Sequence, residues 1–271
     1  MSRKNNSVKA KKLTKKEIYA LYGIEYKDGK IFAPEFGWIN PLLIDGNTKL
    51  GKGVWTFSIL PANIVFHIEI DGRHYEIKGS CPCNCPGCYA QTGNYNFRDV
   101  KASNGRKTWL VYNALDFVRR AIIAQIKADK IQLVRIHAAG DFCSLDYIHA
   151  WRDIVTECPD TVFWTYTKFT AAVNAFSDLE NINIVKSVIQ GLGFNFGKCS
   201  YILKAYRALV AAGKSVYICR CGIDKDQHCT NCKGCSRNEY VLFIEHSTGY
   251  VAENDPAFPE LKAIIEAQPK A

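Results

Sequence analysis

The sequence predicts an α/β protein built around a mainly parallel β-sheet. From residue 112 onward, apolar helical patterns alternate with short strands, which is the order of elements in βαβ units. These strands are apolar along their whole length, as is typical of strands that are covered on both faces. A six-strand partial barrel and an open doubly wound sheet both have this order, so the spacing of the elements leaves the two alternatives open.

The residues before this alternation predict short strands and turns. The stretches FAPEFGWINP and GKGVWTFSILPAN place glycine, proline and asparagine between aromatic residues. Residues 66–79 predict a hairpin that turns at Asp71-Gly72, because this dipeptide is suited to a tight two-residue turn. The second arm of the hairpin leads directly into a cysteine-rich loop.

The alternating region divides into a regular series of helices and strands. Apolar residues at helical spacing predict a helix over 113–130, and an apolar strand follows over 132–140. Ser144 is a suitable N-cap for a helix over 145–157, and residues 161–168 form a β-branched and aromatic strand. The same patterns continue in the segments 171–179, 181–189, 200–213, 214–220 and 240–246.

Length and charge limit the class of protein. The 271 residues suffice for one large domain or two small ones, and no apolar run approaches the ~20 residues of a membrane span. The N-terminus is basic but lacks the apolar stretch of a secretory signal, so we expect a cytoplasmic protein without membrane contact. The net charge is +9, and the first sixteen residues supply seven lysines or arginines and no acid. We expect a solvated basic tail over 1–16, with an arm that contacts nucleic acid as the alternative.

Twelve cysteines are many for a cytoplasmic chain, where disulfides are rare. Cys143, Cys158 and Cys199 are scattered and are expected to be small buried hydrophobic residues. The other nine fall into two groups, at 81–88 and 219–235. Such clusters in a reducing compartment indicate metal binding rather than disulfides.

The first group is too compact for ordinary structural zinc, which usually takes two cysteine pairs separated by a longer loop. Cys81, Cys85 and Cys88 have the spacing CxxxCxxC, which suits three corners of a [4Fe–4S] cluster with one iron left without a protein ligand. Cys83 is a fourth thiol in the same loop. As a ligand it would close the site, and as a free thiol it would leave one iron open.

The loop CPCNCPGC resembles the signature of the radical SAM enzymes. This resemblance implies a partial (β/α)6 barrel and a [4Fe–4S] cluster on Cys81, Cys85 and Cys88. It also implies that S-adenosylmethionine chelates the open iron, with Tyr89 standing in for the aromatic residue of the family loop. The reduced cluster would cleave the ligand to methionine and a 5′-deoxyadenosyl radical, using electrons from a reductant such as flavodoxin or ferredoxin.

The same resemblance assigns roles to residues at the ends of later strands. Gly140 and Asp141 stand where the family has a Gly-Gly-Glu-like motif that meets the amino group of the ligand. Ser187 stands where the family often contacts the ribose. Lys168, at the end of the strand 161–168, and His137 are candidate catalytic residues. The alternatives are a helix-capping Asp141, a surface Lys168 and a hydrogen-bonded core His137.

The second cysteine group predicts a closed metal site. The run C-x2-C-x2-C over 229–235 is typical of iron–sulfur loops, but the preceding C-x-C also fits a four-cysteine zinc site. A second [4Fe–4S] cluster and zinc therefore both remain open. The candidate ligands are Cys219, Cys221, Cys229, Cys232 and Cys235.

A wider part of the chain resembles the phage gene-product-88-like family. The resemblance covers about residues 50 to 240 and includes GVWTFSILPA, CYAQTGNYNF, RIH-x-x-GDF, PDTVFWTYTK and HCTNCKGC. This family is encoded in phages and mobile elements, and membership implies no particular activity.

Together these observations give two hypotheses of function. The first is a radical SAM-like enzyme that abstracts hydrogen from a substrate bound at the carboxyl ends of the strands. The second is a non-catalytic iron–sulfur or zinc-stabilised protein of a phage or mobile element that binds nucleic acid. The expected organisation is a tail over 1–16, a strand-rich segment over 17–78, an α/β core over 79–218, a metal-binding segment over 219–240 and a last strand with a tail over 241–271.

Overall fold

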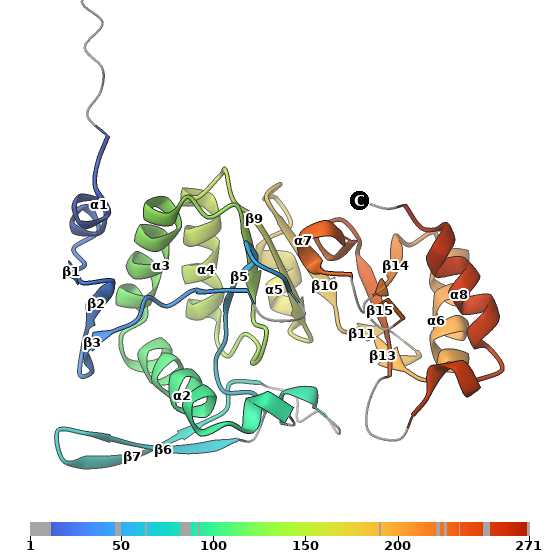
Figure 1. Cartoon of the computed structure of the whole chain (residues 1–271), viewed down its shortest axis with the longest axis horizontal. Helices are drawn as coiled ribbons and strands as arrows, with labels where there is room; N and C mark the ends of the chain where they lie inside the picture. The colour runs from blue at the N-terminus through green and yellow to red at the C-terminus, as the bar shows by residue number, and fades with distance from the viewer. Residues whose placement is uncertain are drawn as a thin grey trace, which may run out of the picture.

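The structure is a computed structural model that describes residues 12–46, 50–62, 64–81, 88–91, 93–189, 191–220, 223–224, 227–232, 234–245 and 250–269. Within these residues the chain is a mixed α/β protein whose strands form five β-sheets. Figure 1 shows the largest sheet near the middle of the molecule, with the second parallel sheet toward the C-terminal end.

The largest sheet has the strand order β10-β9-β8-β5-β4. Its strands β5, β8, β9 and β10 are parallel, with Arg135 of β8 opposite Thr56 of β5 and Trp164 of β9, whereas β4 is antiparallel to β5. Because parallel strands run in the same direction, their carboxyl ends lie along one edge. The bounds are β4 (Ile44–Asp45), β5 (Trp55–Phe57), β8 (Leu133–Ile136), β9 (Val162–Thr167) and β10 (Ile182–Lys186).

Helices cover one face of this sheet. Alternate side chains such as Phe57, Ile136 and Phe163 point into a buried core, where they meet Ile122 and Trp151 of the helical layer. The alternation of a strand places every second side chain on this face. The elements of the layer are α3 (Leu115–Asp129), α4 (Leu145–Glu157) and α5 (Thr170–Ala175), while α2 (Arg98–Asn113) lies at the end of this layer next to α3 (Figure 1).

The other face of the sheet shares a core with a second parallel sheet of order β13-β15-β14. Trp164 and Val185 from the first sheet pack in one cluster with Tyr217 and Val241 from the second. The far side of the second sheet is covered by two helices. The elements are β13 (Phe196–Gly197), β14 (Val216–Ile218), β15 (Tyr240–Ile244), α6 (Cys199–Ala211) and α8 (Phe258–Ala267).

The order of the second sheet bears on the expected partial barrel. β15 lies between β13 and β14, whereas a barrel of consecutive β/α units would place each strand beside its neighbours in sequence. The backbone amide of Lys186, at the end of β10, donates to the carbonyl oxygen of Glu239, just before β15. The two parallel sheets are therefore adjacent in space, and the partial (β/α)6 barrel remains a prediction.

The N-terminal elements form two small antiparallel sheets. The predicted hairpin is confirmed as β6 (Val65–Ile70) and β7 (Arg73–Lys78), and Asp71 and Gly72 have φ angles of 49° and 74° at its turn. The other sheet has the order β1-β2-β3. The remaining short elements are α1 (Lys15–Leu21), β1 (Tyr26–Lys27), β2 (Lys30–Ala33), β3 (Gly37–Ile39), β11 (Val188–Ile189), β12 (Gly193–Phe194), η1 (Tyr89–Gln91), η2 (Gly93–Asn96) and η5 (Ala252–Asn254).

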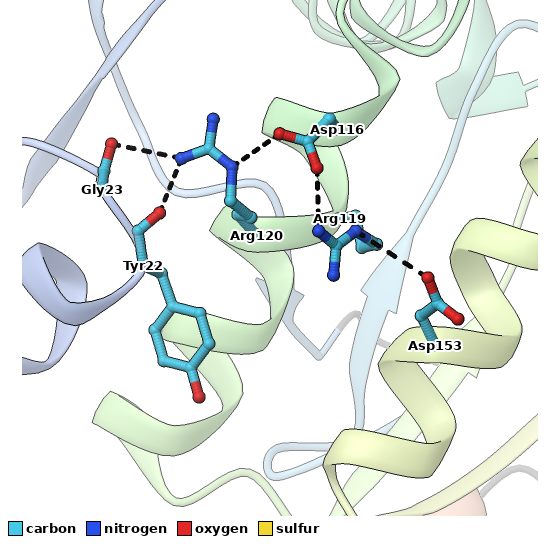
Figure 2. Close-up of polar contacts among 6 residues, drawn as sticks. All are labelled: Tyr22, Gly23, Asp116, Arg119, Arg120 and Asp153. Atoms are coloured by element: carbon cyan, nitrogen blue, oxygen red, sulfur yellow. Dashed lines mark hydrogen bonds and ion pairs between the residues drawn. The ribbon is translucent and has the colours of Figure 1, made fainter.

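Arg120 of α3 fixes the N-terminal segment to the helical layer (Figure 2). Its Nη1 donates to the carbonyl oxygens of Tyr22 at 2.6 Å and Gly23 at 3.3 Å, while its Nε donates to Asp116 Oδ2 at 2.7 Å. The carboxylate of Asp116, one turn earlier on α3, thus orients the guanidinium toward the residues that follow the C-terminus of α1. This contact joins segments about a hundred residues apart.

Three observations change the expected organisation. α1 begins at Lys15 after a Thr14–Glu17 capping box, so the expected tail over 1–16 includes the start of a helix. The segment 17–78 contributes β4 and β5 to the main sheet, and α2 occupies residues for which no helix was expected. Among the described helices, none combines the length and the apolar character that crossing a membrane requires.

Candidate functional site

Four of the predicted site residues lie at one edge of the main sheet. Gly140 and Asp141 follow β8, Lys168 directly follows β9, and Ser187 directly follows β10. These strands are parallel neighbours, so the residues that follow them meet at the carboxyl edge, where ligands commonly bind in α/β proteins.

The buried carboxylate of Asp141 holds this edge together. Its Oδ1 accepts hydrogen bonds from the Phe142 amide at 2.8 Å and the Thr167 hydroxyl at 2.7 Å, and its Oδ2 accepts from the Lys168 amide at 3.0 Å. Burial raises the pKa of Asp141, and the Lys168 amide and the Thr167 hydroxyl oppose that rise. The side chain therefore ties the turn after β8 to the end of β9, and its predicted contact with a cofactor remains a prediction.

Ser80 connects this turn to the loop of the first cysteine group. The Asp141 amide donates to Ser80 Oγ at 3.3 Å, and the Ser80 hydroxyl donates to the Leu60 carbonyl oxygen at 2.9 Å. Ser80 directly precedes Cys81. The chain is thus held against the Asp141 turn one residue before Cys81.

Both the backbone conformation at position 140 and the atoms around it require a glycine there. Its φ angle is +92°, which side-chain-bearing residues rarely adopt. A Cβ atom at this position would lie 2.5 Å from Ile59 Cγ1 and 3.1 Å from the Ile59 carbonyl oxygen. The turn after β8 therefore packs directly on the segment that follows β5.

We expect Gly140→Ala to lower the free energy of unfolding by about 2–4 kcal/mol, since it combines backbone strain with overpacking. Gly213→Ala is the matched control, because Gly213 also has a positive φ of 68° but no described atom lies within 4 Å of its Cβ position. Urea unfolding of both variants separates the two effects. Equal losses would show that the close approach of Ile59 has no energetic consequence.

Cys81 and Cys88 are the thiols of the first cysteine group that the structure describes. Burial raises the pKa of Cys81 to about 12, and the charges of Asp141 and Cys88 add to the rise while Lys168 opposes it. The hydrogen bond from the Asp141 amide to Ser80 places Cys81, the next residue, beside the turn after β8. Cys83 and Cys85 lie outside the described residues, and so does the side chain of Tyr89.

Lys168 and Ser187 follow the paired strands β9 and β10 at the carboxyl edge. The Lys168 ammonium lies 5.8 Å from the centre of the Phe194 ring, and its side chain is half-buried. Ser187 is buried, and its amide donates to the Thr167 carbonyl oxygen at 3.0 Å. Both residues are at the predicted edge, and their proposed catalytic and ribose-binding roles remain predictions.

His137 lies in the core rather than at the edge. It is 2% exposed, its Nε2 is 2.8 Å from the Tyr147 hydroxyl oxygen, and its ring contacts Phe142 and Trp151. Burial, with a smaller contribution from Arg135, lowers its pKa to about 3. The structure therefore favours the alternative of a neutral core histidine and gives no support to a catalytic role.

The buried imidazole predicts a dependence of stability on pH. The unfolded chain binds the His137 proton more tightly than the folded protein, so the folded state loses stability as the pH falls from about 6.5 toward 3. In the middle of this window we expect His137 to contribute a slope of about 1.4 kcal/mol per pH unit. Urea unfolding across this range should show a shallower slope for His137→Asn than for the exposed-residue control His149→Gln. Identical slopes would contradict the assignment.

The second cysteine group lies in the core between the two parallel sheets. Four of its cysteines belong to one apolar cluster with Trp164 and Tyr217, whose hydroxyl lies 3.1 Å from Cys232 Sγ. A cavity of about 10 Å³, room for one water-sized particle, is lined by Cys229, Cys232 and Cys235 but not by Cys219. The four are Cys219, which follows β14, Cys229 and Cys232, which begin and end α7 (Cys229–Cys232), and Cys235, which lies in η4 (Gly234–Ser236). Cys221 lies outside the described residues.

The described residues do not by themselves form a metal centre. In this part of the chain, no group of three or more cysteine, histidine, aspartate or glutamate side chains has an arrangement that could hold a metal ion. The predicted ligands Cys85 and Cys221 lie outside the described residues. The assignments of both cysteine groups to metals therefore remain predictions.

Sequence reasoning missed two residues that shape the site, Ser80 and Thr167. Ser80 and Thr167 each directly precede a predicted site residue, Cys81 and Lys168, and their position was the available signal.

Lys107 of α2 is buried, its Nζ has no hydrogen-bond partner among the described residues, and it lies 5.5 Å from the centre of the Phe57 ring. Burial lowers the pKa of Lys107 to about 8.

Fold and site together describe an α/β protein in which Cys81 lies beside the carboxyl edge of the main sheet and four cysteines of the second group pack in or against a core cluster. The family model described as Gene product 88 matches residues 41–249, so the chain belongs to the Gene product 88 family. The Gene 88 protein of Mycobacterium phage L5 is 45% identical over 53 residues, which are 19% of this chain and 22% of that protein. The match thus spans about a fifth of the length of this relative.

These comparisons confirm the predicted resemblance to the phage gene-product-88-like family. No solved structure matches the chain. The resemblance to radical SAM enzymes is not part of either match and remains a prediction.

Proposed function

We propose that the protein is an iron–sulfur enzyme of the radical SAM type. In this proposal Cys81, Cys85 and Cys88 hold a [4Fe–4S] cluster, and S-adenosylmethionine binds beside it at the carboxyl edge of the main sheet. The observation that carries the proposal is the pair of hydrogen bonds by which Asp141 contacts both Ser80, the residue before Cys81, and the backbone of Lys168. Cys81, Asp141 and Lys168 come from three separate segments of the chain, and the sequence predicts a role at the site for each of them.

The donor set fits the proposed groups. Thiolates are the ligands that iron–sulfur clusters take in proteins. Asp141 fixes the turn after β8 through three accepted hydrogen bonds, which leaves the backbone of Gly140 and Asp141 in a defined position for the amino group of the ligand. Lys168 would supply a positive charge for a carboxylate, and Ser187 a hydroxyl for the ribose.

The cluster would supply the electron that divides S-adenosylmethionine into methionine and a 5′-deoxyadenosyl radical, which then takes a hydrogen atom from the substrate. That electron has to come from outside the chain, from a reductant such as flavodoxin or ferredoxin. The protein would contribute binding, orientation and exclusion of water, as is general for cofactor enzymes.

Release of 5′-deoxyadenosine tests the proposed chemistry. Anaerobically purified protein is incubated with dithionite and S-adenosylmethionine, and the nucleoside products are separated by chromatography. We expect 5′-deoxyadenosine and methionine in equal amounts, and none from the Cys81→Ala variant. Iron-loaded protein that forms no 5′-deoxyadenosine would contradict the proposal.

A second candidate function is favoured by the second cysteine group. Its four described cysteines lie in the core shared by the two sheets, a position that suits a structural metal better than a reacting one. In this alternative, iron–sulfur clusters or zinc ions stabilise a protein that binds nucleic acid through its basic N-terminal residues. Metal analysis separates the two: zinc at both groups, with no iron, would favour the structural protein.

A further inference from the structure

A groove between β7 and α2 lies beside the first cysteine group. Its volume is about 380 Å³, within the range of sites that hold small ligands. β7 ends at Lys78, three residues before Cys81, so the groove adjoins the entry to the cysteine loop. It is lined by Tyr75, Glu76, Ile77, Lys78, Trp109, Tyr112 and Asn113.

The groove is built by close packing of the hairpin on the helix. Gly105 of α2 allows the Phe66 ring of β6 to approach, since a Cβ atom there would lie 2.4 Å from Phe66 Cδ1. Trp109 is fixed from its other side by an edge contact with Phe36, at 5.3 Å between ring centres. The walls of the groove are therefore in place before any ligand arrives, which lowers the cost of binding.

Three aromatic side chains line the groove, and two of them are partly exposed to solvent. Tyr75 is 39% exposed and Tyr112 is 50% exposed, while Trp109 is half-buried. Exposed aromatic side chains on separate elements are the platforms on which proteins stack unpaired bases. The stacking of a planar ring would cover apolar surface that water now contacts.

Charged and polar groups surround these rings. The Lys78 side chain is 78% exposed and is only loosely paired with Glu76, at 3.9 Å. Arg106 is exposed one turn before Trp109, which places it on the same side of α2. Asn113 and Glu76 add an amide and a carboxylate that can bond to the edge of a base. Most of the net positive charge of the chain lies in its first sixteen residues, so the local attraction for phosphate rests on Lys78 and Arg106.

We propose that this groove binds a base of single-stranded nucleic acid, stacked on Tyr75, Trp109 and Tyr112, with Lys78 and Arg106 next to its phosphates. The inference goes beyond the proposed function and does not depend on radical chemistry. It places a nucleic acid beside Cys81.

Fluorescence anisotropy of a labelled oligothymidylate tests the inference, using the full chain as purified anaerobically and without added reductant or S-adenosylmethionine. We expect Tyr75→Ala and Tyr112→Ala each to raise the Kd by about 5- to 150-fold, the usual range for loss of one stacking ring. The control is Trp38→Ala, which removes an exposed aromatic residue on β3 in the other small sheet. Circular dichroism checks that each variant is folded.

Tryptophan fluorescence provides a second measurement, which reports on Trp109 directly. Binding of the unlabelled oligonucleotide should quench tryptophan emission in the native chain and leave less quenching in Trp109→Phe. Equal Kd values for the native chain, Tyr75→Ala and Tyr112→Ala would overturn the inference, as would a loss confined to Trp38→Ala. Free thymidine or S-adenosylmethionine that displaces the oligonucleotide at equal concentration would also overturn it, because the groove would then be a nucleoside site. Since the assay uses no reductant, its failure leaves the formation of 5′-deoxyadenosine untouched.

Discussion

Replacing Cys88 with alanine should remove most of the iron and inorganic sulfide from the first cysteine group. Cys88 is one of three proposed ligands, and a cluster that already has one iron without a protein ligand does not tolerate the loss of a second anchor. Iron and sulfide per chain, with the visible absorbance of the cluster, measure the effect in anaerobically purified protein. A second site at 219–235 would retain its own metal. The metal content of Cys88→Ala is therefore compared with that of the double variant Cys229→Ala with Cys232→Ala, which removes two proposed ligands of the second site.

Cys83→Ala is the matched control for this variant. Cys83 lies in the same loop as Cys88 and is not a proposed ligand, so its removal should leave the iron content unchanged. If Cys83→Ala loses as much metal as Cys88→Ala, all four thiols hold the metal and the site is closed. A closed site would remove the place at which S-adenosylmethionine is proposed to bind.

Removal of the Asp141 carboxylate should have the largest effect on stability among the residues of the edge. Asp141→Ala leaves the Phe142 amide, the Thr167 hydroxyl and the Lys168 amide without their buried acceptor. Unsatisfied buried donors cost about 1–3 kcal/mol each, so we expect a loss of about 3–5 kcal/mol in the free energy of unfolding. Urea unfolding monitored by circular dichroism measures it.

Asp141→Asn and Asp160→Ala complete this series. The asparagine keeps one acceptor oxygen but turns an amino group toward a donor. We therefore expect Asp141→Asn to lower the free energy of unfolding by an intermediate amount, about 1–3 kcal/mol. Asp160 is exposed, and its replacement should change stability by no more than about 0.5 kcal/mol. A loss for Asp141→Ala no larger than that for Asp160→Ala would show that the carboxylate does not hold the edge together.

The parts of the fold that local sequence signals specify were predictable. Asp71-Gly72 has the conformations of a tight turn, and the Ser144 side chain accepts from the Tyr147 amide at the start of α4, as its position before an apolar helix indicated. Helical spacing of apolar residues identified α3. In each case the information lies within a few residues.

Other parts depended on contacts between distant segments. α2 was not expected, because its buried residues include Asn104, Lys107 and Thr108, so its sequence lacks a clear apolar stripe. The position of β15 between β13 and β14 is set by pairing across the chain, which alternation of helix and strand does not encode. Tertiary packing rather than local preference decided both.

The candidate site shows the same division. Strand ends could be located from sequence, and parallel pairing then brings Asp141, Lys168 and Ser187 to one edge. The partners of Asp141 could not be found in this way, since Ser80 lies 61 residues away and Thr167 lies 26 residues away. His137 was considered for catalysis because it is close to Asp141 in sequence, but its side chain points into the aromatic core.

The electron paramagnetic resonance spectrum of dithionite-reduced protein, with and without S-adenosylmethionine, tests the central proposal most directly. The proposal predicts a reduced-cluster signal whose shape changes when S-adenosylmethionine is added, because the ligand binds at or beside an iron next to Cys81 and Asp141. A cluster signal that is indifferent to S-adenosylmethionine, or no signal in protein that contains zinc, would contradict it.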